Sequence, residues 1–342
     1  MTLPSQPPTD SPTTARPLRI LVAQNVVHNR RGGMSRMLGF LHDRVAADGH
    51  TVEFFGADQV SPRLNRRLGR FAFPWLLWQH AVAAAKAGKP FDIINVHEPS
   101  AAAIALGKRA AGNPLLVVTS HGVEERGWEV ALEDARLGRA PLPLKTKIWY
   151  PLTLLPQTRI GFARADHIFC LNEEDRAFLV RKYCLPTQRV TRLFPAADPA
   201  YLDAFPRRTF TSCDRLLVFG TWQARKGAAD IVNAFGTLAA RRPDLKLMLM
   251  GTGIPAEAVQ SWFPEPLRGR LEFVPPGSES ELAEQMLRAS VYLIPSLFEG
   301  TPQTLVEAMA TGLASVATAT CGMKDVIQDG TNGLLAPIRD PV

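Results

Sequence analysis

Short apolar runs alternate with longer amphipathic segments along most of the chain, and this rhythm restricts the fold more than any other feature. One series of runs comprises residues 19–23, 51–55, 93–96, 115–119 and 165–170, and a second comprises 215–220, 245–250, 271–274, 291–294 and 314–317. Strands that are apolar on both faces require helices on both faces of their sheet. The sequence therefore predicts an α/β fold with two Rossmann-like, doubly wound parallel-sheet domains facing a cleft.

The break between the two series predicts the domain organisation. We expect a disordered leader at residues 1–17, which are rich in Pro, Ser and Thr, followed by domains at 18–205 and 206–342. The polar stretch 195–213 is predicted to link them, with helices at 35–48 and at about 228–241. Ligands of such proteins bind in the crevice between domains, so the site is expected there.

Composition narrows the ligand class without choosing one ligand. The chain has 39 Lys and Arg against 32 Asp and Glu, and its net charge of +7 suits nucleotide phosphates, acidic lipids or nucleic acid. The four cysteines contain no CxxC pair, which argues against a structural zinc site and fits a reducing cytosol. The apolar stretch 71–85 is too short to span a bilayer, and no signal-peptide pattern is present. We therefore expect a cytoplasmic protein.

A dinucleotide-binding oxidoreductase is the first alternative to consider for this fold. Its fingerprint requires three glycines spaced GxGxxG on a strand-to-helix turn. The segment 24–33 after the first strand lacks that spacing, and the Gly251–Gly253 turn has Ala256 in the third position. This alternative is therefore rejected.

The segment from Pro295 to Gly312 carries the most specific signal in the sequence. It follows an apolar run, with Thr301 as the predicted N-cap, Pro302 as the first helical residue and Gly312 as the helix end. This places a helix N-terminus at the carboxyl end of a parallel strand, where it faces the cleft. Such an N-terminus attracts an anion.

The residues of this helix suggest what the anion belongs to. The amides of Gln303 and Thr304, with the Thr304 hydroxyl, are expected to hold a phosphate, while Leu305 turns inward. Glu299 at the helix mouth and Glu307 one turn further on can accept hydrogen bonds from sugar hydroxyls. Either glutamate alone would be interpreted as solvated surface charge.

These motifs resemble the retaining GT-B glycosyltransferases of family 4, the nucleotide-sugar-dependent group 1 enzymes. The signature of that family is two glutamates with seven residues between them in a Phe-Glu-Gly-x-Pro context, which corresponds here to residues 298–302 and Glu307. Further segments that match the family pattern are Gly32-Gly33, residues 119–124, residues 172–175, Gly220 with Lys226-Gly227, and residues 329–335. Members usually continue with more helices, so the C-terminal end is expected to be shortened.

The resemblance assigns a role to each matching residue. It implies that His121, Glu299 and Lys226 are catalytic, with His121 near the reacting carbon and Lys226 neutralising the leaving diphosphate. The implied donor-binding residues are Gly32, Gly33, Arg225, Lys226, Gly300, Gln303, Thr304, Leu305 and Glu307. His97 and Glu124 are expected on the acceptor side.

Two departures qualify the chemistry that the resemblance implies. The family commonly has an arginine directly after the glycine at position 220, where this chain has Thr221, and Arg225 is the candidate to replace it. No Asp-x-Asp motif is present, so we expect no metal and no cofactor besides the sugar donor. Retention is expected to proceed by front-face substitution, since no carboxylate pair for double displacement is evident in the N-terminal domain.

A basic and aromatic region indicates a second kind of partner. Arg63, Arg66, Arg67 and Arg70 share one helical face and precede an aromatic band at 71–78. A second set comprises Arg139, Lys145, Lys147, Trp149 and Tyr150. Basic residues beside aromatic ones suit the anionic inner face of a membrane. A solvated basic face beside core aromatics is the alternative.

The predicted function is a retaining, hexosyl-type glycosyltransferase. It would move a sugar from a nucleotide-diphosphate donor to a glycan or lipid-linked acceptor, in polysaccharide or glycoconjugate biosynthesis. A GT-B nucleotide-sugar epimerase and a non-catalytic nucleotide-binding protein are the alternatives. No nucleic-acid partner is expected, because the arginines do not belong to a recognisable binding module.

Overall fold

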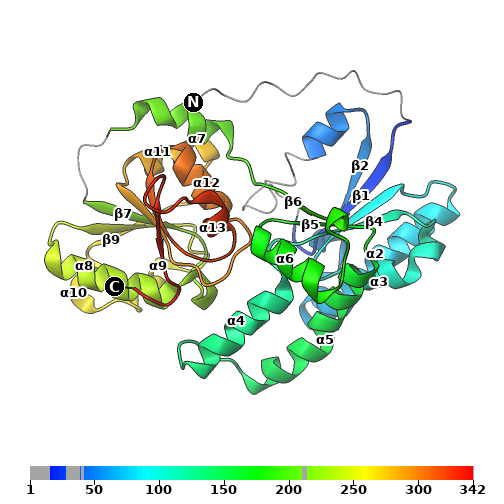
Figure 1. Cartoon of the computed structure of the whole chain (residues 1–342), viewed down its shortest axis with the longest axis horizontal. Helices are drawn as coiled ribbons and strands as arrows, with labels where there is room; N and C mark the ends of the chain where they lie inside the picture. The colour runs from blue at the N-terminus through cyan, green and yellow to red at the C-terminus, as the bar shows by residue number, and fades with distance from the viewer. Residues whose placement is uncertain (1–15, 28–38, 40–41, 210–213, 342) are drawn as a thin grey trace.

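A computed structural model describes residues 16–27, 39, 42–209 and 214–341 of the chain. Within them, two six-stranded parallel sheets flanked by helices lie side by side (Figure 1). The predicted α/β fold with two doubly wound parallel-sheet domains is confirmed. Most of the predicted leader, residues 1–15, lies outside the described residues.

The N-terminal sheet has the strand order β2-β1-β3-β4-β5-β6. Its strands are β1 (Arg19–Ala23), β2 (Thr51–Phe55), β3 (Ile93–His97), β4 (Leu115–Thr119), β5 (His167–Cys170) and β6 (Val190–Arg192). Its helices include α2 (Pro62–Lys86), α3 (Ala102–Gly107), α4 (Glu124–Arg136), α5 (Leu144–Arg164) and α6 (Glu173–Lys182). The core joins strand residues such as Ile94 and Leu116 to Phe73 and Leu77 of α2.

The C-terminal sheet has the strand order β12-β11-β10-β7-β8-β9. Its strands are β7 (Arg215–Phe219), β8 (Lys246–Met250), β9 (Leu271–Val274), β10 (Val291–Ile294), β11 (Ala314–Thr318) and β12 (Leu334–Ala336). Its helices include α8 (Ala228–Arg241), α9 (Ala256–Gln260), α10 (Glu265–Arg268), α11 (Glu279–Leu287), α12 (Gln303–Ala310) and α13 (Cys321–Val326). Two apolar clusters form the core of this domain.

Each predicted apolar run is a strand, within two residues at either end. The helix α8 has the predicted limits, and residues 42–47 form the described end of the helix predicted at 35–48. The sequence did not predict β6 and β12. Both are three-residue strands at sheet edges, and such strands need few apolar side chains because they are short and partly exposed.

The polar stretch 195–213 contains the helix α7 (Pro199–Ala204), which packs against the C-terminal domain. Tyr201 and Ala204 are fully buried in the core there, and the Tyr201 hydroxyl donates to Glu279 at 2.6 Å. These two residues precede the expected boundary at 205/206. In packing, the C-terminal domain therefore begins at α7.

Each sheet reverses its order of strand addition at one point, and these points locate the site. In the N-terminal sheet β1 lies between β2 and β3, and in the C-terminal sheet β7 lies between β8 and β10. At such a switch point, neighbouring loops leave in opposite directions and open a crevice at the carboxyl ends of the strands. His97 is the last residue of β3, and the loops after β7 and β10 carry Lys226 and Glu299.

In the part of the chain that the structure describes, ionic contacts connect the two domains at α6 with α13 and at Arg139 with α8. Glu174 of α6 accepts hydrogen bonds from Lys324 at 2.9 Å and from the Cys321 amide at 3.2 Å, and α6 and α13 lie side by side between the sheets (Figure 1). Arg139, beyond α4, donates to both oxygens of buried Asp230 on α8 at 2.6 and 2.7 Å. Arg139 was expected in the basic membrane-facing set but lies in this domain contact instead.

We expect Gly227→Ala to lower the free energy of unfolding more than Gly138→Ala. Both glycines have positive φ, +75° and +67°, so each alanine incurs backbone strain of about 1–2 kcal/mol. Only at Gly227 would the new Cβ also overlap a backbone oxygen, that of Pro295, whereas the space around Gly138 is open. Urea denaturation followed by circular dichroism measures both. Equal losses would contradict the packing of the β7–α8 loop on Pro295.

Candidate active site

The loop between β7 and α8 places two cations at the switch point of the C-terminal sheet. A 3₁₀ turn at Ala224–Lys226 leads into Gly227, whose φ of +75° favours glycine. The amide of Leu297, after β10, donates to the carbonyl of Arg225 at 2.9 Å. This bond holds the loop beside the segment that carries Glu299.

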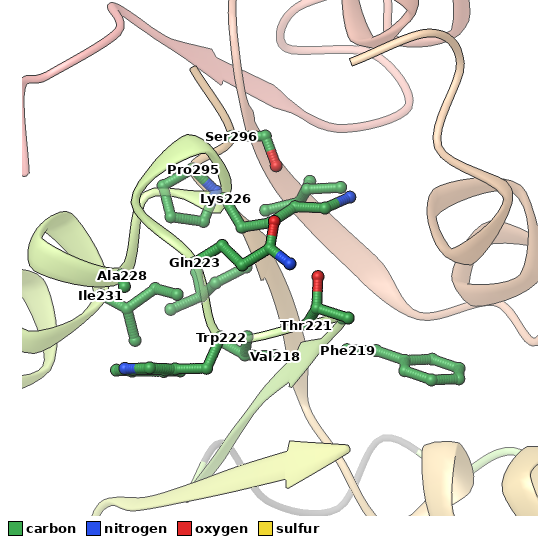
Figure 2. Close-up of a pocket in the computed structure, with 13 residues that line it drawn as sticks. Val218, Phe219, Thr221, Trp222, Gln223, Lys226, Ala228, Ile231, Pro295 and Ser296 are labelled. Carbon is green, nitrogen blue, oxygen red and sulfur yellow. The ribbon is translucent and has the colours of Figure 1, made fainter. Parts of the chain in front are cut away.

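A small pocket of about 20 Å³ lies beside this loop and is lined by residues 218–223, Lys226, Ala228, Ile231 and 293–296. The hydroxyl of Thr221, the amide of Gln223 and the ammonium group of Lys226 lie on the same side of the pocket (Figure 2). Thr221 stands where the family has an arginine. A short hydroxyl side chain therefore occupies this position, and the second cation near Glu299 is Arg225.

Glu299 is buried between these two cations. Its Oε1 accepts hydrogen bonds from Lys226 and, at 2.9 Å, from Ser296, while its Oε2 lies 3.4 Å from the Arg225 guanidinium. Burial by itself would raise the pKa of Glu299, but the charges of Lys226 and Arg225 and the hydrogen bonds hold that pKa below its usual value. Glu299 is therefore ionised at neutral pH.

The start of α12 differs from the prediction. Pro302 is the N-cap residue and Gln303 the first helical residue. Thr301, predicted as the N-cap, donates its hydroxyl hydrogen bond to the carbonyl of Leu171 in the N-terminal domain. The predicted cap is therefore wrong, because the hydroxyl is used in a domain contact. Gly312 ends the helix as predicted, with a φ of +70°.

The other predicted residues of α12 have different surroundings. The Thr304 hydroxyl lies 2.7 Å from the hydroxyl of Tyr292 on β10. The Leu305 side chain is fully buried in the C-terminal core and its amide donates to the Pro302 carbonyl, as expected for a residue that turns inward. Gln303 and Glu307 are buried on the same helix. The opening amides of α12 precede Leu305, and helix-opening amides lack an acceptor within the helix.

His97 and His121 form a stacked pair at the carboxyl ends of β3 and β4, two interior strands of the N-terminal sheet. His97 ends β3 and His121 follows β4, and Nε2 of His121 lies 2.7 Å from Nδ1 of His97 with ring centroids 4.7 Å apart. Burial lowers the pKa of His121 to about 4. Burial, and then the neighbouring His121, lower the pKa of His97 well below its usual value. Both imidazoles are therefore neutral at pH 7 and act as hydrogen-bonding groups.

The loop of His121 touches the loop of Glu299 through backbone atoms. Gly122 has a φ of +133°, and a Cβ there would lie 3.2 Å from the amide nitrogen of Gly300. A Cβ on Gly300 would lie 2.5 Å from the carbonyl oxygen of His121. Asn172 of the N-terminal domain also donates to the Glu299 carbonyl at 3.4 Å. The predicted catalytic residues of the two domains are therefore adjacent.

The sequence did not predict Glu98, which holds the start of α4. Its Oε2 accepts from the Ser120 hydroxyl at 2.6 Å, and its Oε1 accepts from the Glu124 amide at 3.0 Å. Burial and the neighbouring Glu124 charge raise the pKa of Glu98 well above its usual value. The Glu124 carboxylate in turn accepts from the hydroxyl of Tyr150 on α5. The only signal for Glu98 is its position directly after a strand.

Two predicted site residues cannot be placed, and two others had no predicted role. Gly32 and Gly33 lie outside the described residues. Asn172 belongs to the predicted family segment 172–175 but was given no role, and Ser296 was given none either, since only its position after β10 distinguishes it from other polar residues. In the described ranges, no group of three or more His, Cys, Asp or Glu side chains could hold a metal ion.

Two family models match consecutive segments of the chain. The model for Glycosyltransferase Family 4 covers residues 31–201, which is half of the chain, and the model for Glycosyl transferases group 1 covers residues 213–342. The chain belongs to the family 4, group 1 glycosyltransferases. The resemblance based on residues 298–302 and Glu307 is thereby confirmed at the level of the family.

Two of the curated relatives have names that mention an inositol compound. A phosphatidyl-myo-inositol mannosyltransferase of Mycolicibacterium smegmatis is 28% identical over 255 residues, which are 73% of this chain and 59% of that protein. A D-inositol 3-phosphate glycosyltransferase of Frankia alni is 25% identical over 268 residues, 73% of this chain and 63% of that protein. The matches thus span about three-fifths of these relatives.

Solved structures agree with the GT-B fold of the family. Sucrose-phosphate synthase from Thermosynechococcus elongatus has a TM-score of 0.72 at 21% identity, covering 95% of this chain and 87% of that one. Anabaena HepE in complex with UDP and glucose has a TM-score of 0.64 at 15% identity, with the same coverage. The two facing parallel-sheet domains are therefore a GT-B fold.

We expect the His121 imidazole to remain neutral from about pH 8 down to about pH 5, because its pKa is far below the unfolded value of about 6.5. The unfolded chain binds the proton more readily, so the stability that His121 contributes above about pH 6.5 is lost as the pH falls towards 4. NMR titration of the ring signals and urea denaturation against pH measure both effects, and His121→Gln should reduce the slope. A titration midpoint near 6.5 would contradict the buried pair.

Proposed function

We propose that the protein is a glycosyltransferase that moves a sugar from a nucleotide-diphosphate donor to an acceptor hydroxyl. One observation carries this proposal: Lys226, Arg225 and Glu299 meet at the switch point of one domain, and the backbone at His121–Gly122 of the other domain lies against the Glu299–Gly300 backbone. Two cations suit a diphosphate, and a buried carboxylate suits sugar hydroxyls. Membership of the family supports the same reaction.

In this proposal the donor lies along the C-terminal domain. The diphosphate binds Lys226, Arg225 and the opening amides of α12, with the Gly32-Gly33 amides contributing from the other domain. Glu307 accepts from the ribose hydroxyls and Glu299 from the transferred sugar. The complex of HepE with UDP-glucose supports a nucleotide sugar as the donor class.

Charge development explains why cations are needed at this position. Breaking the bond between sugar and diphosphate leaves negative charge on the phosphate oxygens. Lys226 now bonds Glu299, and in the proposed complex its other two hydrogens donate to the leaving phosphate. Arg225 and the α12 N-terminus add positive potential. These groups supply the stabilisation, and we propose that no metal and no further cofactor takes part.

We propose that the reaction retains the anomeric configuration by front-face substitution. Double displacement would need a carboxylate nucleophile about 5 Å from a second carboxylate. The candidate on the N-terminal side, Glu98, has both oxygens engaged, one by Ser120 and one by the Glu124 amide. The leaving phosphate would therefore take the acceptor proton itself, while neutral His121 donates or accepts a hydrogen bond beside the reacting carbon.

The acceptor is proposed to be a glycan or a lipid-linked polyol that enters from the N-terminal domain, near His97 and Glu124. The names of the inositol-directed relatives support a polyol acceptor. No helix in the described ranges is long and apolar enough to cross a membrane. We propose contact with the anionic cytoplasmic face of a membrane through exposed basic residues such as Arg63 and Arg70. The side chains of Arg66 and Arg67 lie outside the described residues.

Arg225→Ala is expected to lower kcat/KM by roughly 10-fold to 100-fold, since a charge-assisted contact to the leaving phosphate is lost. Adding Thr221→Arg to that variant should restore part of the activity, because it places a guanidinium directly after Gly220, where the family commonly has an arginine. Arg242→Ala is the matched control, because Arg242 is exposed directly after α8 and pairs with Asp244. Donor turnover measured by mass spectrometry tests this. Full activity of Arg225→Ala would exclude it as a phosphate ligand.

Glu307→Gln and Glu299→Gln should separate binding from transfer. The first is expected to weaken nucleotide binding in calorimetry with UDP, GDP and ADP, and the second to lower kcat with little change in nucleotide affinity. Thermal unfolding of both variants controls for folding. Identical effects on affinity and turnover would contradict the two roles. Release of free nucleotide without any acceptor would favour the epimerase instead.

A further inference from the structure

An apolar groove of about 830 Å³ lies on the N-terminal domain between α2, α3 and α5. Leu64 and seven residues between Leu68 and Trp78 of α2 form one wall, α3 contributes small and apolar residues between Ala102 and Gly107, and Gln157 and Ile160 of α5 complete it. Its volume falls in the range of about 300–1,000 Å³ that small-molecule sites occupy. None of the residues assigned to the donor site lines it.

The side chains at the rim of this groove are large, apolar and exposed to solvent. Leu68, Phe71, Trp75 and Leu106 are 55%, 51%, 53% and 60% exposed. The Trp75 ring lies 4.9 Å from that of Trp78, which also lines the groove. A contiguous exposed apolar surface of this kind marks a binding site.

The shape of the groove suits an extended hydrocarbon chain. Its lining along α2 crosses a kink at Leu68, and the part from Leu68 to Trp78 is about 15 Å long at the rise of an α-helix. One leaflet of a bilayer is half of the roughly 30 Å hydrocarbon core, so an acyl chain is of comparable length. The polar atoms expected of a nucleotide or sugar site are almost absent from the lining, where Gln157 is the one amide side chain that the structure records.

The charge of the surrounding helices indicates that the headgroup of the bound lipid is anionic. The sequences of α2 and α5 contain no Asp or Glu, although the whole chain contains 32. Arg63 and Arg70 on α2, and Lys145 and Lys147 on α5, are exposed. Acid-free helices with basic and aromatic side chains are complementary to anionic lipid headgroups.

We propose that this groove binds one hydrocarbon chain of an anionic lipid, while the exposed basic side chains of α2 and α5 bind its headgroup phosphate. Contacts lead from there to the cleft: the Arg70 guanidinium lies 5.6 Å from the Tyr150 ring centroid, Tyr150 donates to Glu124, and Glu98 accepts from the Glu124 amide. The use of this path by a lipid acceptor rests on the proposed function. The binding of the chain does not.

The test uses the full chain, with Trp149→Phe to remove the exposed tryptophan of α5, and no sugar or nucleotide. Vesicles of phosphatidylcholine and phosphatidylglycerol with brominated acyl chains quench tryptophans that contact the chains. We expect quenching from Trp75 and Trp78, and its loss when both are replaced by Phe. Ala103→Phe fills the groove from α3 and should abolish quenching, and Ala240→Phe, which adds the same ring at an exposed position of α8, should not.

Leu106→Glu, at a rim position that is already exposed, replaces Ala103→Phe if that variant does not fold. Vesicle-bound Ala103→Phe or Leu106→Glu that is quenched like the parent would overturn the proposal, because the aromatic band would then only rest on the surface. Absence of vesicle binding at low salt would overturn it as well. A chain that is quenched as expected but transfers no sugar would leave the groove intact and contradict only the proposed function.

Discussion

The site depends on one close approach between the domains, where the backbone at Gly300 lies against the carbonyl of His121 and that at Gly122 lies against Gly300. A side chain at either glycine would separate the two loops. Because the contact is made by backbone, it sets the distance between Glu299 and His121 without relying on flexible side chains. The hydrogen bonds from the Thr301 hydroxyl to Leu171 and from Asn172 to Glu299 hold the same junction.

Charge is distributed unequally across this junction. The C-terminal side has ionised Glu299 between Lys226 and Arg225, where mutual attraction outweighs the cost of burial. The N-terminal side presents neutral imidazoles, since burial keeps His97 and His121 unprotonated. In the proposed complex, the cations on the C-terminal side bind the diphosphate, Glu299 binds the transferred sugar, and the neutral imidazoles lie on the side of the acceptor hydroxyl. This division agrees with the proposed roles of the two domains.

The elements that sequence predicted well are those whose signal is local. Continuous apolar strands, and the segment 298–302 with Glu307, can be recognised from a few neighbouring residues. The Thr301 cap was wrong because its hydroxyl bonds across the domain interface, and no local pattern indicates a partner 130 residues away. Arg139 was misplaced for the same reason, since its partner Asp230 lies in the other domain. Edge strands β6 and β12 are too short to give a periodic signal.

By itself, the sequence determined that two parallel sheets form and that one helix begins between Glu299 and Glu307. Both follow from strand burial and helix signals, which are local properties. Only the tertiary structure decided which residues meet. Strand order placed the loops after β7 and β10 at one switch point, so Lys226 reaches Glu299, and strand register placed His97 beside His121. Helix packing formed the groove between α2, α3 and α5 from side chains far apart in the chain. Such contacts depend on how distant elements pack, which no local spacing encodes.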